Sequence, residues 1–99
     1  MSKTSEPIEL STPIKRGDTE IAEIVLRKPM SGELRGLKLT DLLNGDVSAT
    51  IRLVPRISQP SLTEQEVAAM DPADLYDCAD EIAGFLNWKR VKALESQDA

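Results

Sequence analysis

Residues 61–88, SLTEQEVAAMDPADLYDCADEIAGFLNW, decide the fold because they contain two consecutive helix starts. Thr63 is a capping residue, and Glu66 follows it at the spacing of a capping box. Leu62 before the cap and Val67 after it are spaced to pack on each other as a hydrophobic staple. The pattern predicts a first helix that begins after Thr63.

The second helix start lies at Asp71, whose side chain can accept hydrogen bonds from the free amides of the next turn. Pro72 occupies the first helical position, where no amide is needed. Asp74 places negative charge near the positive end of the helix, and Met70 and Leu75 repeat the staple. Asp71 is therefore predicted to cap a long helix that meets the first helix at a fixed corner.

The long helix has one apolar face and one acidic face. Its apolar residues recur at the intervals typical of a face packed on a core: Leu75, Cys78, Ala79, Ile82, Phe85 and Leu86. The other face carries Asp74, Asp77, Asp80 and Glu81. We interpret these carboxylates as a solvated face and Cys78 as a small buried hydrophobe.

The N-terminal part is predicted to form a β-hairpin over Ile8–Lys28, with its turn at residues 15–18. Alternation places two sets of residues on the buried faces of the strands: Ile8, Leu10, Thr12 and Ile14 in the first, and Ala22, Ile24 and Leu26 in the second. Pro13 restricts the first strand to a sheet edge. Arg16-Gly17-Asp18 spells an adhesion tripeptide but is interpreted as turn chemistry.

Two short helical segments are predicted after the hairpin. Glu33 opens a helical turn, and Thr40 caps a brief helix that stops at Asn44-Gly45.

Residues 47–57 fit either a strand, by alternation, or a helix, by intervals of three and four. A possible cap at Asp46 favours the helix. Pro55 predicts that the regular part ends or kinks near Val54, and residues 58–61 are predicted to form a loop.

The length of 99 residues indicates one domain. We predict a small α+β fold in which the N-terminal β-hairpin is followed by a helical remainder of three to five helices. The expected organisation is a flexible N-terminus over residues 1–7, a single domain over residues 8–92 and a flexible tail over residues 93–99. The expected core contains Ile24, Leu26, Leu43, Ile51, Val54, Leu75, Ile82 and Leu86.

Composition argues against several classes of function. The chain has no histidine and no glycine-rich phosphate loop, so we expect no enzyme activity, no catalytic residue and no cofactor. The acidic helix face lacks the glycine-bearing loop of a calcium site, so no metal site is expected. The net charge is −5, with nine acidic and three basic residues after Ile57, which disfavours nucleic acid as a partner. The opening residues lack the apolar core of a secretory signal, and no apolar run is long enough to span a membrane.

Two long segments resemble the tail assembly chaperone family of contractile-tailed bacteriophages and Mu-like prophages, the E, 41 and 14 group. They are LRKPMSGELRGLKLTDLLNGDVSATIRLV, residues 26–54, and PRISQPSLTEQEVAAMDPADLYDCADEIAGFL, residues 55–86. The resemblance covers about four fifths of the chain, and it lies in the order and spacing of several short motifs. It also favours a helix for residues 47–57.

The resemblance implies a binding protein. Members of the family bind the tape measure protein that sets tail length, keep it soluble, help to recruit tail tube subunits and then leave. The implied partners are the tape measure protein and a frameshift-extended form of the chain itself, with the tail tube protein as a further candidate. The implied location is the host bacterial cytoplasm and not the mature virion. The alternative function is a small structural tail or head–tail connector subunit that stays in the particle.

The family supplies no binding motif that can be carried over to individual residues. From the sequence, the candidate partner-binding residues are apolar side chains near the end of the long helix, where they can contact a partner helix: Ile82, Phe85, Leu86 and Trp88.

Overall fold

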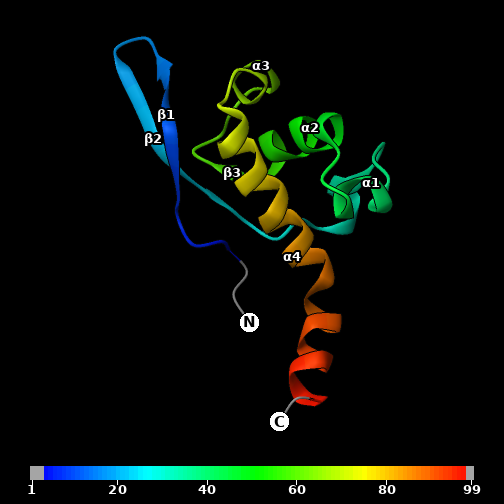
Figure 1. Ribbon diagram of the computed structural model, residues 1–99. Helices are drawn as coiled ribbons and strands as arrows, with labels where there is room; N and C mark the ends of the chain where they lie inside the picture. Colours follow the sequence, from blue (N-terminus) through cyan, green and yellow to red (C-terminus); the bar gives the residue numbers. More distant parts are fainter. Residues whose placement is uncertain (1–3, 98–99) are drawn as a thin grey trace.

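The computed structural model describes the backbone of residues 4–97 and the side chains of residues 4–87. Its elements are β1 (Ile8–Arg16), β2 (Thr19–Leu26), the 3-10 helix η1 (Ser31–Leu34), α1 (Leu39–Leu43), α2 (Val47–Ile57), β3 (Ser58–Gln59), α3 (Glu64–Ala68) and α4 (Pro72–Gln97). The hairpin lies on one side of α4, and α1 and α2 lie on the other (Figure 1). The predicted α+β fold, a hairpin followed by helices, is confirmed.

The hairpin forms where the sequence predicts it. Gly17, at φ 61°, supplies the positive φ of the turn between β1 and β2. β1 is an edge strand of the sheet order β1-β2-β3, which accommodates Pro13. The predicted loop 58–61 is wrong in its first half, because Ser58 and Gln59 pair with Leu26 and Val25 as β3. This short strand was not recognisable from two residues that directly follow a helix.

An irregularity in β1 changes the predicted strand faces. Residues 10–13 lie opposite Ala22 alone, so β1 bulges away from β2. The alternation is interrupted there: Thr12 and Ala22, both predicted inside, are exposed, and Ile21 is buried instead. The amides of the bulge bind the carboxylate of Asp74, at 2.8 Å from Ser11 N to Oδ1 and 3.3 Å from Thr12 N to Oδ2.

Asp74 therefore does not belong to the solvated face to which the sequence assigned it. Asp74 is 1% exposed, whereas Asp77 and Asp80 are exposed and Glu81 is partly exposed. A carboxylate in the first turn of α4 satisfies two amides that the bulge removes from the ladder, and it joins the helix start to the sheet.

Local capping signals are confirmed at three helix starts. The Asp46 carboxylate accepts from Ala49 N at 2.9 Å, and the Asp71 carboxylate accepts from Ala73 N at 2.9 Å. Thr63 and Glu66 form the predicted capping box.

Residues 47–57 form a helix, so of the predicted end or kink near Val54 the end is wrong. α2 continues through Pro55 to Ile57, so the ring removes one amide from the last turn without stopping the helix. Two residues hold that turn in place, since Leu53 and Ile57 are both buried.

The core is mainly aliphatic and is shared by the sheet and the helices. Ile24, Leu26, Val54 and Ile82 are buried as predicted, as is Cys78. Ile51, Leu75 and Leu86 are only partly buried and pack against the core. Leu43 is 39% exposed, so its prediction as a core residue is wrong; Leu42, its neighbour in the short helix α1, is buried in its place.

Arginine side chains connect the hairpin tip and the segment around η1 to the helices by hydrogen bonds. Arg16 donates to Glu66 through Nε at 3.0 Å and Nη2 at 2.7 Å, and Nη2 also reaches Ser61 O at 2.8 Å. The tip of the hairpin is thereby joined to the start of α3, and Arg16 of the adhesion-like tripeptide has a structural role. The hydrogen bond from Arg16 lowers the pKa of Glu66 to about 2.

A second arginine pair holds the segment around η1 against α2. Arg27 pairs with both carboxylate oxygens of Glu33 and donates to Arg56 O at 2.9 Å. Arg56 in turn donates to the carbonyls of Glu33 and Arg35. The hydrogen bond from Arg27 lowers the pKa of Glu33 to about 2.

Candidate binding surface

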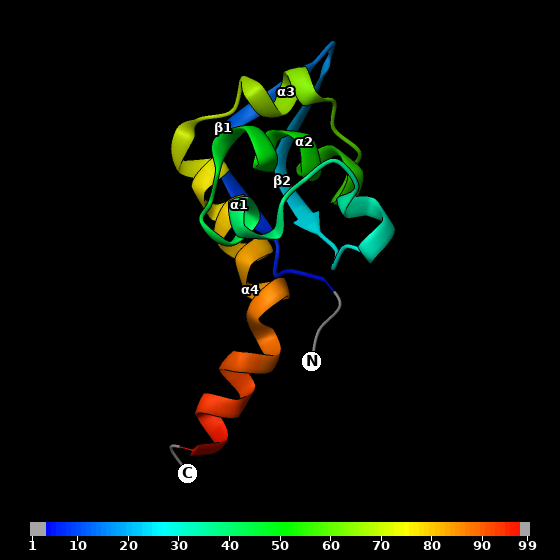
Figure 2. The ribbon, with the colours of Figure 1, turned by 90° about the vertical axis from the view of Figure 1, so that its right-hand side faces the viewer.

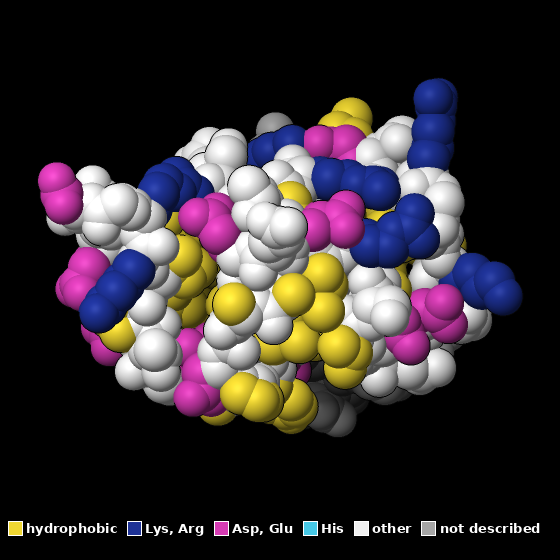
Figure 3. Space-filling model, turned by 90° about the horizontal axis from the view of Figure 1, so that it is seen from above, with side chains coloured by type: hydrophobic (Ala, Val, Ile, Leu, Met, Phe, Trp, Pro, Cys, Tyr) yellow, Lys and Arg dark blue, Asp and Glu magenta, His cyan; other side chains and the backbone are white. Residues whose placement is uncertain are grey.

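An apolar groove of about 420 Å³ lies between α4 and the α1–α2 corner. Three of its lining residues are large and exposed to solvent: Leu43 by 39%, Val47 by 58% and Tyr76 by 71%. Exposed apolar side chains that line one concave surface are typical of a site for another apolar surface. Figure 3, which shows the molecule from above, likewise has hydrophobic side chains exposed among charged ones on that face.

Small residues form the groove by bringing two elements close together. Gly45, at φ 72°, ends the α1 segment, and a Cβ atom at this position would lie 3.9 Å from the Cβ atom of Ala79. Ala79 and Ala83 line the groove from α4, and they leave space that longer side chains would fill. The site is therefore fixed by the backbone stop after α1 and by alanines at an interval of four on α4.

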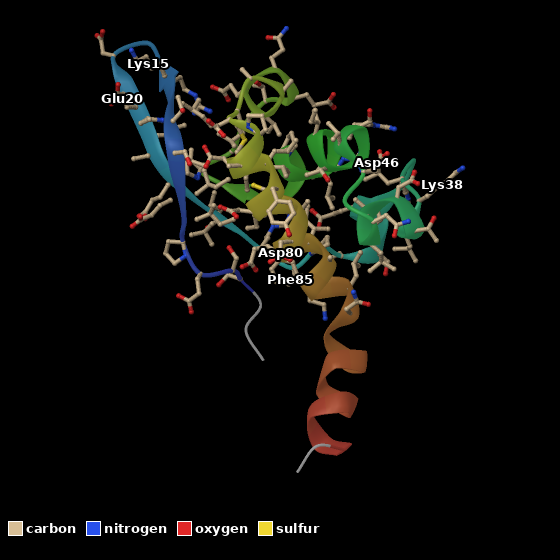
Figure 4. The ribbon with its side chains drawn as sticks, in the orientation of Figure 1. Lys15, Glu20, Lys38, Asp46, Asp80 and Phe85 are labelled. Atoms are coloured by element: carbon tan, nitrogen blue, oxygen red, sulfur yellow. The ribbon has the colours of Figure 1, made fainter. Side chains whose placement is uncertain are left out.

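The charge around the groove is acidic. Asp80 is the one charged side chain among the described lining residues. Asp46, the cap of α2, lies next to Val47, and Figure 4 places Lys38 on the far side of α1 from α4. The groove thus presents apolar walls with an acidic side chain, which suits an apolar helix with basic residues beside its stripe.

The flank of α4 next to the groove is acidic as well. Burial, followed by the charges of Asp80, Glu6 and Asp77, raises the pKa of Glu81. Within the described residues, no group of three or more His, Cys, Asp or Glu side chains is placed to hold a metal ion. None of the helices in the described part of the chain has the length and apolar character needed to cross a membrane.

The four predicted partner-binding residues occupy different environments. Ile82 is fully buried and Phe85 is 7% exposed, so both belong to the core. Leu86 is partly buried and packs against it. The side chain of Trp88 lies outside the described residues.

Sequence reasoning missed Leu43, Val47 and Tyr76 as surface residues. A usable signal existed for Tyr76, which falls off the apolar stripe of the long helix although it is one of three aromatic residues in the chain. No local signal shows that α1 and α2 lie beside that tyrosine, because their contact with α4 joins distant parts of the chain.

The fold and groove describe a small α+β domain with a surface suited to a helical partner. The family model "Phage tail assembly chaperone proteins, E, or 41 or 14" matches residues 7–87. The chain therefore belongs to the phage tail assembly chaperone family, and the resemblance found in the sequence is confirmed.

Two relatives from Escherichia phage P2 agree with this assignment. "Tail assembly protein E" is 45% identical over 85 residues, which are 86% of this chain and 93% of that protein. "Tail assembly protein E'" is 46% identical over 79 residues, which are 80% of this chain but only 56% of the longer relative. No solved structure shows a significant match. The class of function, a tail assembly protein of a bacteriophage, follows from these relationships.

Proposed function

We propose that this chain binds the tape measure protein of its phage, keeps it soluble and aids assembly of the tail tube. A tape measure is a long helical chain whose apolar stripe is exposed before assembly and would otherwise self-associate. A chaperone for such a chain needs an apolar surface that a helix can enter and leave.

The groove between α4 and the α1–α2 corner is the observation that supports this function best. Its exposed residues Leu43, Val47 and Tyr76 offer apolar contacts, and Asp80 adds negative charge beside them. With a net charge of −5, several bound copies would repel one another and so oppose aggregation of coated tape measures. Each contact should be weak, with avidity arising from many copies along one chain.

The remaining partners and the location belong to the same proposal. The E' relative carries a large part outside the matched region, which supports a frameshift-extended form of this chain as a second partner. The tail tube protein is a third candidate. The protein acts in the host bacterial cytoplasm, without enzymatic activity, and leaves before the virion is complete.

The four residues expected to bind a partner take different roles in this proposal. Ile82 and Phe85 hold α4 in place from the core side. Leu86 follows Ala83 of the groove by three residues and so extends the contact surface along α4. Trp88 is kept as a candidate contact from the sequence alone.

Co-expression with the cognate tape measure protein tests the function. Soluble tape measure and co-purification should both fall in a Tyr76→Ser variant. Met30→Ser is the matched control, because Met30 is equally exposed, at 71%, and does not line the groove. It should behave as wild type.

Two results would contradict the chaperone function. The first is a tape measure that stays equally insoluble with and without this chain and its extended form. The second is this chain as a stoichiometric component in mass spectra of purified particles, which would establish the structural subunit instead.

A further inference from the structure

The C-terminal half of α4 projects beyond the rest of the molecule. α4 runs as one helix over Pro72–Gln97, and among its side chains that the structure describes, up to Asn87, Phe85 is the last one buried in the core. Figures 1 and 2 show the following turns extending away from the sheet and from α1–α3. The molecule is correspondingly elongated, at 50 × 29 × 21 Å.

This projecting segment is rich in basic residues, which are absent from the described lining of the groove. Its sequence after Asn87 is WKRVKALESQ, with the basic residues Lys89, Arg90 and Lys92 and only one acidic residue, Glu95. Val91 and Leu94 are three residues apart, the interval at which residues share one side of a helix. The groove has apolar walls and Asp80 as its charged lining residue. The two surfaces are complementary in charge and in apolar character.

The segment cannot enter the groove of its own chain. The groove is lined by residues 72–83 of α4, and the basic segment continues the same helix further along its axis. A continuous helix does not fold back on itself, so any groove that receives this segment belongs to another molecule.

We propose that two copies of the chain pair through antiparallel α4 helices, each placing its C-terminal segment in the other copy's groove. A two-fold axis level with Phe85 brings together residues equally far from that position in sequence. Asp80 then meets Arg90, each five residues from Phe85. Ala79 meets Val91 and Tyr76 meets Leu94 by the same count.

The pairing uses the free side of α4. Tyr76, Ala79, Asp80 and Ala83 line the groove, opposite the side that Cys78, Ile82 and Phe85 bury in the core. Both grooves are filled at once, so the association closes at a dimer. The apolar groove is covered in the free protein, and a helix of another partner has to displace the second copy to enter it.

Charge exchange on the full-length chain tests the pairing, with sedimentation equilibrium as the measurement. Asp80→Arg and Arg90→Asp should each weaken dimerisation at least tenfold, and the variant carrying both changes should recover it. The single changes move the net charge in opposite directions, so a general charge effect cannot weaken both. Asp18→Arg in the exposed hairpin turn is the control and should not change the dimer.

Cysteine cross-linking tests the register without altering charge. A mixture of Ala79→Cys and Val91→Cys chains should form an intermolecular disulfide, whereas either variant alone should not. Ala22→Cys, on the exposed part of β2, replaces Ala79→Cys in the control mixture and should leave Val91→Cys unlinked. Circular dichroism checks that each variant retains its helices.

The proposal is overturned by a wild-type chain that stays monomeric at millimolar concentration. It is equally overturned if the double variant is weaker than both single variants, or if the Ala79–Val91 mixture does not cross-link. No tape measure protein is present in these experiments, so their outcome is independent of the proposed chaperone function.

Discussion

Replacement of Asp74 by alanine should destabilise the domain by about 2–4 kcal/mol. The carboxylate accepts hydrogen bonds from Ser11 N at 2.8 Å and Thr12 N at 3.3 Å, and the residue is 1% exposed. Hydrogen bonds to a charged group contribute about 1.5–3 kcal/mol each. The total is reduced because Ser11 and Thr12 are themselves exposed, so water can replace part of the lost contact.

Asp74→Asn should cost less, about 1–2 kcal/mol, since its amide retains one acceptor oxygen but loses the charge. Asp77→Ala is the control, because Asp77 is an exposed carboxylate on the same helix, and it should change stability by less than about 0.5 kcal/mol.

Urea unfolding followed by circular dichroism measures these free energies, and thermal unfolding should agree. For a domain of this size, 1 kcal/mol corresponds to about 4–8 °C in Tm, so the Tm of Asp74→Ala should fall by about 10–30 °C. The reasoning fails if Asp74→Ala unfolds within 0.5 kcal/mol of wild type, or if Asp77→Ala costs as much.

Three further predictions follow from caps, ion pairs and burial. Asp71→Ala removes the acceptor for Ala73 N and should cost about 1 kcal/mol in the same urea assay; an unchanged midpoint would count against the cap. The carboxyls of Glu33 and Glu66 have pKa values lowered to about 2, so their ion pairs contribute stability above about pH 4.5 that is lost as the pH falls toward 2. Tm should therefore drop more steeply over this range in wild type than in a Glu33→Gln/Glu66→Gln variant, and parallel curves would refute the assignment. Burial raises the pKa of the Cys78 thiol to about 12, so a bulky disulfide reagent should modify it only after unfolding; rapid stoichiometric labelling of the native protein would contradict this packing.

Features encoded by neighbouring residues were predictable from the sequence. The caps at Asp46, Thr63 and Asp71 depend on contacts across two or three residues, and the structure has all three. The hairpin turn at Gly17 is equally local.

Features that join distant residues were not predictable in the same way. In the sequence, Asp74 looks like one more carboxylate of a solvated face. Its burial depends on the contact with Ser11 of β1, which is 63 residues away in the chain. The bulge that shifts Thr12 outward depends on that contact and on the register with β2. Pro55 is tolerated inside α2 because Ile57 after it is buried, which depends on tertiary packing and not on helix propensity.

The sequence predicted that the candidate site lies on the long helix, but it did not predict the groove that α1 and α2 form beside this helix. Periodicity identified the long helix as the main apolar element, and Leu86 on it lies next to the groove residue Ala83. Val47 and Leu43 become part of the surface only because α1 and α2 pack beside α4. A hydrophobic pattern shows that a helix has an apolar face, but not which neighbour leaves part of that face uncovered.

Because α4 continues past the core as one helix, the helix itself sets the direction in which the residues after Asn87 point relative to the domain. An extra residue after Asn87 would leave the core contacts of Ile82 and Phe85 unchanged. It would move everything beyond it by about 1.5 Å along the axis and turn it by about 100°. Seven extra residues, nearly two full turns, would restore the direction to within about 20°. The body of the domain therefore sets the angular phase of whatever sequence follows, with a period of about seven residues.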